Sequence, residues 1–224
     1  MKITYYGHSC FLVEENNSRI LFDPYEDGSV PGFAITTYKE NGKPNVCFHS
    51  WSCFHGDQTA FFAVMGNLYQ HTHTYANIQR ERCFGINFLP IRFYERLVNT
   101  IHHNGFETDE FEAGGFTHSV AKTITAPMIR EAFLNMECTL KEAQDLSGAG
   151  ITSMIVGKVQ HISVEVEYAQ GYEQRYGKEG FMMLVPAPQN LVTGEPCQSA
   201  FVAVQIQKYD EMSDTNKRSS APFS

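Results

Sequence analysis

The sequence predicts a mainly β protein, an antiparallel barrel that is closed or partly closed and carries short helical inserts. Many short segments alternate apolar and polar residues, few show helical spacing, and strand and helix patterns do not alternate regularly along the chain. Regular strand–helix alternation is typical of parallel sheets covered by helices, so its absence argues against a doubly wound sheet. A barrel lets many antiparallel strands pair without long exposed edges.

The predicted strands begin in the first part of the chain. KITYYGHSCFLVEE and RILFDPY form the two halves of a predicted β-hairpin, with a turn at residues 16 to 18. The turn-rich stretch EDGSVPG, residues 26 to 32, marks a domain boundary. Two strands follow in FAITTYKENGKPNVCFHSWSCF, joined at Asn41-Gly42, a dipeptide that supplies the positive φ angles of a tight hairpin.

The rest of the chain adds strands and two helices. FFAVMGNLY and CFGINFLP predict strands, whereas TYANIQRER (74 to 82) and IRFYERLVNTIHH (91 to 103) predict helices. A loop is predicted for residues 104 to 120, and long strands for FLNMECTLKEAQDL and ITSMIVGKVQHISVEVEY. We therefore expect an N-terminal β-hairpin extension, a barrel domain and a flexible polar tail, covering residues 1–31, 32–210 and 211–224.

Composition narrows the function. The 224 residues carry a formal net charge of -8, which argues against a general nucleic-acid binder with a basic face. The N-terminus has no basic region followed by an apolar run, and no apolar stretch approaches a membrane span. The six cysteines are scattered without CxxC spacing, which is typical of reduced thiols. We expect a cytoplasmic protein that binds neither nucleic acid nor membranes.

The segment QHTHTYANI, residues 70 to 78, raises two alternatives, and the first is a metal site. A zinc site needs three or four ligands, and His71 and His73 supply two. In the HxHxDH run of metallo-β-lactamase-type hydrolases an aspartate and a third histidine follow, whereas tyrosine and alanine follow here. His102 and His103 are adjacent, so their side chains diverge in regular structure. We predict no metal site.

The second alternative is a phosphate loop. His71, Thr72, His73 and Thr74 run directly into a predicted helix start. A helix N-terminus offers unpaired N–H groups and a partial positive charge, and both suit an anion. Hydroxyl groups at such a position also occur simply as helix caps, so the pattern by itself leaves both roles open.

Several segments resemble, in order, the flavin reductase-like FMN-binding split-barrel family, which includes the flavoredoxins. The resemblance covers residues 32 to 194 and rests on AITTYKENGKPNVCFHSWSCF, FFAVMGNLYQHTHTYANIQRERCFGINFLP, TDEFEAGGFT, APMIREAFLNMECTLKE and IVGKVQHISVE. It implies a Greek-key antiparallel split barrel that binds FMN. The cofactor-binding residues that it implies are Ser50, Trp51, Ser52, Cys53, His71, Thr72, His73, Thr74 and Asn87.

The resemblance assigns these residues to different parts of FMN. Thr72 and Thr74 are the expected phosphate donors, the segment from residue 50 to residue 53 contacts the flavin, and Asn87 lies near the ring or the ribityl chain. Each has an ordinary structural alternative. Trp51 could fill the core, Asn87 could end a strand, and Cys53 could be a packing residue.

Two features depart from the family. The lysine of the family's "DKFEAAGLT" loop is Glu110 here, which weakens the case for reductase activity if that lysine helps to hold the phosphate or the nicotinamide cofactor. Residues 1 to 25 instead resemble the first hairpin of metallo-β-lactamase-fold hydrolases, "MKITYLGHSCFLIE". This second resemblance ends before any metal ligand and leaves His8 without ligand partners, so we expect a non-catalytic extension.

The expected function is that of an FMN-binding oxidoreductase, an NAD(P)H-dependent flavin reductase in which hydride moves to flavin N5. The cofactor supplies this chemistry, so we predict no catalytic triad or general base. The resemblance also implies a homodimer with the flavin at the subunit interface. The first alternative is a flavoredoxin-like carrier that passes electrons between redox proteins without efficient NAD(P)H oxidation. A metal-dependent hydrolase is a remote alternative.

Overall fold

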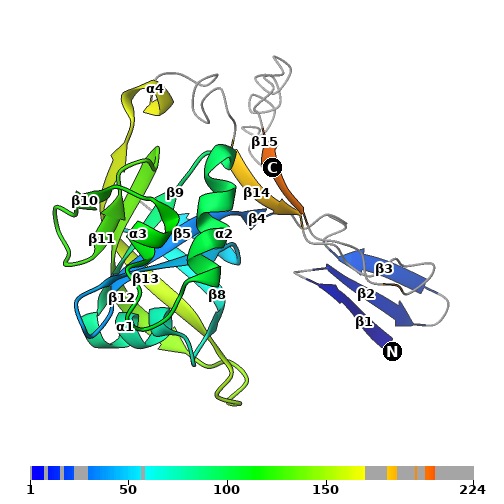
Figure 1. Cartoon of the computed structure of the whole chain (residues 1–224). Coiled ribbons are helices and arrows are strands. Elements are labelled where there is room, and N and C mark those ends of the chain that lie inside the picture. The colour runs from blue at the N-terminus through cyan, green and yellow to red at the C-terminus, as the bar shows by residue number, and fades with distance from the viewer. Residues whose placement is uncertain are drawn as a thin grey trace.

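The computed structural model describes residues 2–7, 10–15, 18–22, 30–56, 59–169, 181–185, 195 and 200–204. Its main body is a seven-stranded sheet with the order β6-β5-β9-β12-β13-β8-β7, in which every neighbouring pair is antiparallel. The sheet curls into the predicted split barrel (Figure 1). Its strands are β5 (Phe33–Tyr38), β6 (Pro44–His49), β7 (Ser52–Gly56), β8 (Phe61–Tyr69), β9 (Cys83–Phe88), β12 (Leu134–Gln144) and β13 (Thr152–Val164).

The barrel closes around one large apolar cluster. Alternate residues of the strands supply it, including Phe33, Met65, Phe84 and Ile155, all of which are fully buried. The long strands β12 and β13 shift register twice along their pairing, and such bulges bend a sheet and increase its twist. Gly157 allows the strands to approach because a Cβ there would overlap the ring of Phe84.

Two helices confirm the sequence-based expectation. α1 (His73–Glu81) begins one residue before the predicted helix, and η1 (Ile91–Phe93) continues into α2 (Tyr94–His102). The α2 helix packs on β6 and buries Leu97 in a second apolar cluster, on the other side of β5 and β6.

The loop predicted for residues 104 to 120 is wrong in part. It contains α3 (Glu110–Gly114) and the short strand β10 (His118–Val120), which pairs with β11 (Pro127–Ile129). Asp109 caps α3, because its carboxylate accepts hydrogen bonds from the N–H groups of Phe111 and Glu112. Burial of Phe111 then fixes this single helical turn, which is too short to give a periodic sequence pattern.

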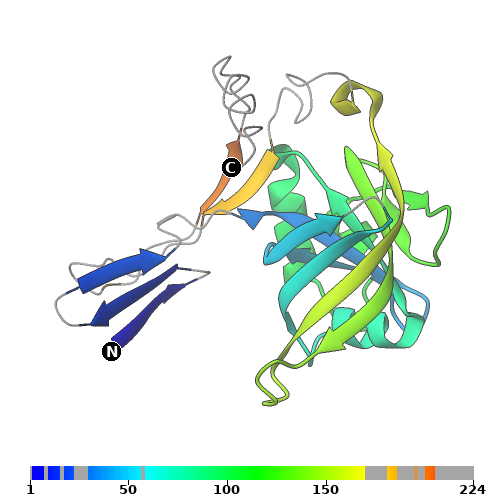
Figure 2. The same ribbon diagram turned by 180° about the vertical axis from the view of Figure 1, so that it is seen from behind.

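A small sheet lies at one end of the barrel (Figures 1 and 2). It has the order β15-β14-β4, with β4 (Val30–Pro31), β14 (Phe181–Val185) and β15 (Ala200–Val204). Phe201 stacks on Phe48 at 4.7 Å between ring centroids, so β15 packs against the barrel through β6. The short helix α4 (Val166–Ala169) follows β13.

The N-terminal extension has three strands where the sequence predicted one hairpin. β1 (Lys2–Gly7), β2 (Cys10–Glu15) and β3 (Ser18–Phe22) form an antiparallel sheet, and both views show it standing apart from the barrel (Figures 1 and 2). Gly7, the last residue of β1, pairs with Cys10, the first residue of β2, so the chain reverses between these two strands. The alternating pattern runs on either side of this reversal and conceals it. His8 and the predicted tail lie outside the described residues.

None of the helices in the described part of the chain has both the length and the apolar content that a membrane span requires.

Candidate functional site

A groove of about 360 Å³ lies beside the edge strand β7. Three of the predicted flavin-contact residues, Trp51, Ser52 and Cys53, line it. The opposite wall comes from the turn between β12 and β13, far away in sequence. The remaining lining residues are Val64, Gly66, Asn67, Leu146, Ser147, Thr152, Ser153 and Met154. An apolar surface interrupted by a few hydroxyl and amide groups is typical of sites that hold an aromatic ligand.

The backbone between β6 and β7 is held in place by His49 and Gly66. The carbonyl oxygen of Trp51 accepts a hydrogen bond from Gly66 N at 2.8 Å and lies 3.2 Å from His49 Nε2. Burial lowers the pKa of His49 to about 4, and its contacts with the Trp51 and Gly66 backbone oppose the shift. The imidazole is therefore neutral at physiological pH and donates to the Trp51 carbonyl. Ser50, the fourth predicted residue of this segment, is buried and does not line the groove.

The floor of the groove contains two backbone irregularities. Asn67 has φ 54°, in the left-handed region that asparagine tolerates better than most residues. The pairing of β13 with β8 shifts register between Ser153 and Ile155, which is a β-bulge beside the groove. Bulges and left-handed residues recur next to functional sites because they redirect side chains. Sequence reasoning missed Asn67, although the Gly66-Asn67 dipeptide inside a predicted strand is a signal of such an irregularity.

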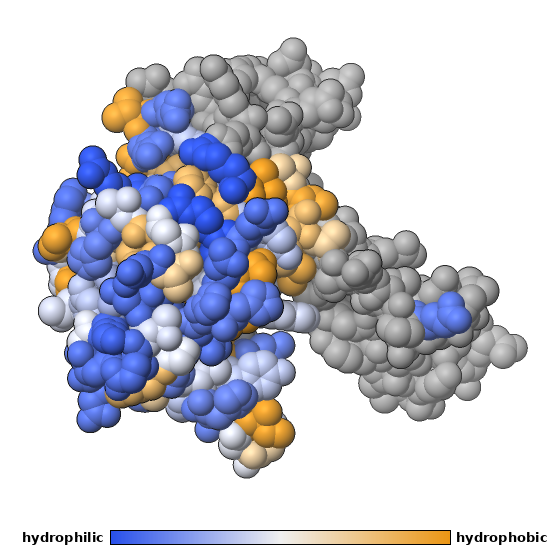
Figure 3. All heavy atoms as spheres, viewed as in Figure 1, coloured by the Kyte–Doolittle hydropathy of each residue, from blue (hydrophilic) through white to orange (hydrophobic). Residues whose placement is uncertain are grey.

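The wall formed by the β12–β13 turn is ordered by one carboxylate. Asp145 accepts hydrogen bonds from the N–H groups of Ser147, Gly148 and Gly150. These bonds lower the pKa of Asp145, and Gly150 makes the largest contribution. Figure 3 shows hydrophobic side chains at the tip of this hairpin, at the bottom of the view, where Leu146 is 72% exposed.

Gln70 links the groove to the histidine- and threonine-rich loop. Its Nε2 atom lies 3.1 Å from Asp145 Oδ2, 3.1 Å from Ser153 Oγ and 3.2 Å from the carbonyl oxygen of Thr152. Thr152 and Ser153 line the groove, and the loop begins at Gln70. The two predicted parts of the site are therefore separate regions that share β8 and are tied together at its end.

The loop leads into the N-terminal end of α1, and residues 71 to 74 are called the mouth of α1 below. The threonine hydroxyls of this mouth have partners within the protein. Thr72 caps α1, because its Oγ1 accepts from Tyr75 N at 3.3 Å and donates to the Tyr69 carbonyl at 2.7 Å. Thr74 is buried, and its Oγ1 accepts from Asn45 Nδ2 at 2.9 Å. The phosphate-donor role of these two hydroxyls stays a prediction. In this structure both hydroxyls are hydrogen-bonded to other groups of the protein.

Other donors remain at the mouth of α1. Within the described residues, the N–H groups of His73 and Thr74, in the first turn of α1, have no hydrogen-bond acceptor. The side chain of His71 is exposed, and that of His73 is partly buried with its ring 5.9 Å from that of Phe106. The mouth therefore offers backbone N–H groups and imidazoles to an anion.

The side chain of Asn87 is hydrogen-bonded within the protein. It is fully buried, and its Nδ2 donates to the Ala34 carbonyl and to Thr36 Oγ1, while its Oδ1 accepts from Ile129 N. These bonds join β9 to β5 and β11. The resemblance implied a contact between Asn87 and a flavin. Such a contact would require the Asn87 side chain to give up hydrogen bonds within the protein and to bond to the flavin instead.

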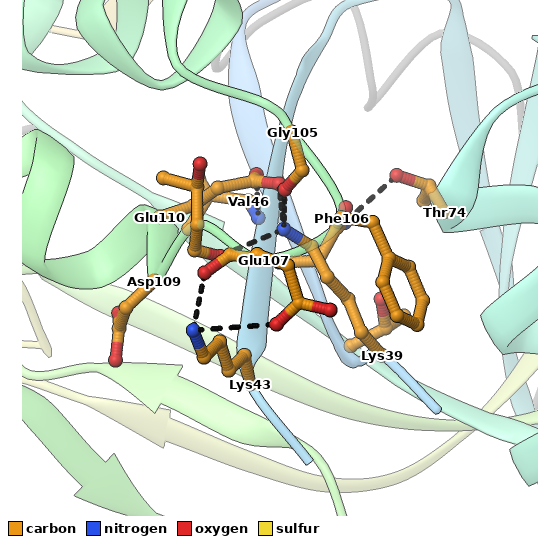
Figure 4. A network of polar contacts seen from close by, with 12 residues as sticks. Lys39, Lys43, Val46, Thr74, Gly105, Phe106, Glu107, Asp109 and Glu110 are labelled. Atoms are coloured by element: carbon orange, nitrogen blue, oxygen red, sulfur yellow. Dashed lines mark hydrogen bonds and ion pairs between the residues drawn. The ribbon is translucent and has the colours of Figure 1, made fainter. Parts of the chain in front are cut away.

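Glu110, the residue that departs from the family pattern, forms a buried ion pair (Figure 4). Its Oε1 lies 2.8 Å from Lys39 Nζ, and its Oε2 accepts from Val46 N at 2.6 Å. Lys39 Nζ also donates to the carbonyl oxygens of Gly105 and Thr108. Burial raises the pKa of Glu110, and the hydrogen bond and charge of Lys39 oppose the shift. The two charges are therefore paired with each other inside the protein.

The described cysteines of the barrel are buried or partly buried except for Cys53. Cys47 is partly buried, and burial raises the pKa of its thiol to about 11, while Cys83 and Cys138 are buried. Cys53, in the groove, is exposed. In the ranges that the structure describes, no three His, Cys, Asp or Glu side chains form a group that could hold a metal ion.

Comparison with known proteins settles the family. The model of the "Flavin reductase like domain" matches residues 30–179, two thirds of the chain. The chain belongs to the flavin reductase-like family. A relative from Methanothermobacter thermautotrophicus, itself uncharacterized, is 25% identical over 136 residues, which cover 60% of this chain and 63% of the relative.

Solved structures share the fold of this flavin reductase-like chain. A split-barrel protein from Shewanella frigidimarina, described as a flavin reductase, superimposes with a TM-score of 0.66 at 20% identity, over 81% of this chain and 85% of that one. Flavoredoxin of Desulfovibrio vulgaris superimposes with 0.63 at 17% identity, over 90% and 99%. Nitrilotriacetate monooxygenase component B from Bacillus cereus gives 0.67 at 13% identity, over 80% and 86%. These structures support the split-barrel fold.

Proposed function

We propose that this flavin reductase-like protein is an FMN-binding oxidoreductase that accepts hydride from NADH or NADPH. The observation that carries the proposal is the groove beside β7, which lies within the family domain and is lined by Trp51, Ser52 and Cys53. Its volume falls in the usual range of small-molecule sites. Bound flavin would supply the redox chemistry, by taking a hydride at N5 and passing electrons onward.

The lining of the groove suits an isoalloxazine ring chemically. Trp51, Leu146 and Met154 offer apolar and aromatic surface to a flat ring. Ser52, Asn67 and the hydroxyl groups across the groove offer donors and acceptors to the ring's polar edge. These residues would orient the ring and exclude water from one of its faces. The rigid backbone at Trp51 keeps this surface in place without a bound ligand.

The mouth of α1 suits the phosphate end. The ring and the phosphate of FMN lie at opposite ends of a ribityl chain, so a site for it needs two separate regions. Residues of β8 rise by roughly 3.3 Å each, which puts Gln70 roughly 13 Å along the chain from Gly66 in the groove floor. At the mouth, the N–H groups of His73 and Thr74 would bind the phosphate together with His71. A homodimer with the flavin at the subunit interface is part of this proposal.

Titration with flavin tests the proposal. We expect FMN to bind to the purified protein with quenching of its fluorescence, and the chromophore released from freshly purified protein to be FMN. Trp51→Ala should weaken binding, because it removes the aromatic surface. His161→Asn, on β13 outside the groove lining, is the matched control and should bind as the unaltered protein does. A colourless protein that leaves FMN fluorescence unchanged would refute the proposal.

A flavoredoxin-like carrier is the second candidate, and one observation favours it. At the position of the family's loop lysine this chain has Glu110, and the neighbouring Lys39 is buried and paired with it. Neither side chain can offer a free cation to a nicotinamide nucleotide. Steady-state oxidation of NADH and NADPH with bound FMN distinguishes the two functions. The reductase proposal expects turnover, whereas bound FMN that is reduced by dithionite but not by either nucleotide indicates the carrier.

A further inference from the structure

The segment from residue 105 to residue 108 contains one backbone hydrogen bond, from Thr108 N to Gly105 O at 3.0 Å, and side chains hold it against the rest of the protein. Its four consecutive carbonyl groups all accept hydrogen bonds from the turn between β5 and β6 (Figure 4). Lys39 Nζ donates to Gly105 at 2.8 Å and to Thr108 at 2.9 Å, Asn41 Nδ2 donates to Phe106 at 3.1 Å, and Lys43 Nζ donates to Glu107. The position of this segment therefore depends on three side chains that are distant in sequence.

The central donor is a charge without access to solvent. The Lys39 side chain has no exposed surface, and the carboxylate of Glu110, 1% exposed, neutralises it at 2.8 Å. A buried ion pair seldom adds net stability over apolar residues of the same volume, and in some proteins it serves to specify one arrangement of the chain. Lys39 cannot touch a bound ligand, so any effect on a ligand acts through the segment that it holds.

The same turn and strand also hold the mouth of α1. Asn45, next to the turn, donates to the buried hydroxyl of Thr74 in the first turn of α1, and its neighbour Val46 donates to Glu110. On the other side, Phe106 lies edge-on to His73, the first residue of α1, at 5.9 Å between ring centroids. The segment, the ion pair and the helix mouth thus form one connected unit.

We propose that Lys39 and Glu110 are positioning residues for the anion site at the mouth of α1, and that they fix the 105–108 segment, which carries Phe106, against His73. This inference rests on the proposed function, because it takes the anion to be the phosphate of FMN. It assigns the ion pair a role in recognition of the phosphate end and none at the isoalloxazine ring, which lies in the groove beside β7.

The test compares FMN with riboflavin, which has the same ring and ribityl chain but no phosphate. The variant Lys39→Met/Glu110→Gln removes both charges and two carbonyl contacts, while the amide oxygen of the introduced glutamine can still accept from Val46 N. It leaves no unpaired buried charge, so the barrel should remain folded. Lys141→Met/Glu142→Gln is the matched control, because it makes the same two substitutions at exposed positions of β12.

We expect the Kd for FMN to rise about tenfold in Lys39→Met/Glu110→Gln, as for the loss of one well-placed charged hydrogen bond. The Kd for riboflavin should change by less than about twofold, and the control variant should bind both flavins as the unaltered protein does. Equal weakening for both flavins, or no change for either, would overturn the inference and leave the proposed function intact. Failure of the unaltered protein to bind either flavin would overturn both.

A milder variant covers the case in which Lys39→Met/Glu110→Gln fails to fold. Asn41→Ala/Lys43→Met removes the exposed half of the same contacts, where loss of the hydrogen bonds cannot unfold the core. FMN binding should weaken by about threefold and riboflavin binding should not change. An unchanged ratio of the two dissociation constants in this variant would overturn the inference.

Discussion

Lys39 Nζ lies 2.8 Å from Glu110 Oε1, and the two side chains, far apart in sequence, are shielded from solvent. This pair joins the β5–β6 turn to the start of α3, and Val46 N donates to the second carboxylate oxygen. A buried charge that loses its partner is far more costly than the intact pair. Removal of one of the two residues should therefore cost more stability than removal of both.

Replacement of Lys39 alone should be strongly destabilising and sensitive to pH. In Lys39→Met the Glu110 carboxylate stays buried without a cation, and we expect the free energy of unfolding to fall by about 3–5 kcal/mol at neutral pH. Burial already raises the pKa of Glu110, and loss of Lys39 removes an opposing effect. The folded protein therefore takes up a proton more readily than the unfolded chain, so the loss should shrink as the pH falls.

Urea denaturation at pH 7 and pH 5 measures this loss. The double variant Lys39→Met/Glu110→Gln is its control, since it has no buried charge at these two positions at either pH. At pH 7 it should lose less stability than Lys39→Met, and its loss should vary less with pH. If the two variants are equally destabilised at pH 7, the loss of stability in Lys39→Met does not come from an unpaired Glu110 carboxylate.

His49 should make stability depend on pH in the acidic range. Its pKa is lowered to about 4 by burial, whereas the unfolded chain should titrate near the usual value of about 6.5. As the pH falls from about 6.5 to about 4, the unfolded chain takes up a proton that the folded chain does not, so stability decreases. The full loss is at most about 3 kcal/mol, since the side chain retains some solvent contact.

The variant His49→Gln isolates this effect in urea denaturation across pH 4 to 7. It removes the titrating group, so the difference in unfolding free energy between the unaltered protein and the variant should narrow as the pH falls. His55→Gln, at an exposed histidine on β7, the next strand along the chain, is the matched control substitution. A constant difference between the unaltered protein and His49→Gln would contradict the assignment.

Gly157 should resist substitution because of its neighbours and not because of its backbone. A Cβ at this position would overlap the ring of Phe84 and press on Cys138 at 3.1 Å, where β13 crosses the core. We expect Gly157→Ala to lower the free energy of unfolding by about 1–3 kcal/mol, as overpacking does in tight cores. Gly66→Ala is the control, since the nearest atom to its Cβ would be the Trp51 carbonyl oxygen at 4.0 Å. Thermal unfolding that ranks the two variants in the opposite order would refute this.

The strands and helices could be predicted from the sequence wherever a pattern within one short segment determines the element. Alternation predicted the barrel strands, and the residues before Tyr75 predicted the start of α1, where Thr72 indeed caps the helix. The single turn of α3 was missed because its stability comes from the Asp109 cap and from burial of Phe111, which no short periodic pattern records. Sequence patterns within a segment were thus sufficient to predict the long strands and helices. They failed for α3, which forms because of its tertiary contacts.

The candidate site was only half predictable for the same reason. Trp51 to Cys53 were assigned through the resemblance, and they do line the groove. The opposite wall comes from the β12–β13 turn, much further along the chain, and nothing in its sequence indicates that it returns to β7. Glu110 was singled out as a departure from the family, but its partner Lys39 could not be found, because their pairing depends on how the sheet curls.

Cys53 provides a chemical probe of whether the flavin ring occupies the groove. Its thiol is exposed and lines the groove, whereas burial raises the pKa of Cys47 to about 11 and shields Cys83 and Cys138. Of these four cysteines, Cys53 should react first with iodoacetamide, because the thiolate is the nucleophile and access governs its rate. Peptide mapping by mass spectrometry resolves each cysteine and gives its rate of alkylation.

FMN should protect this thiol. At a free FMN concentration about ten times Kd, alkylation of Cys53 should slow about tenfold, because only the unoccupied groove exposes the sulfur. The buried cysteines serve as internal controls, since their slow rates depend on opening of the fold and not on access to the groove. If FMN binds and Cys53 still reacts at its original rate, the ring lies elsewhere, and the groove beside β7 is not the flavin site.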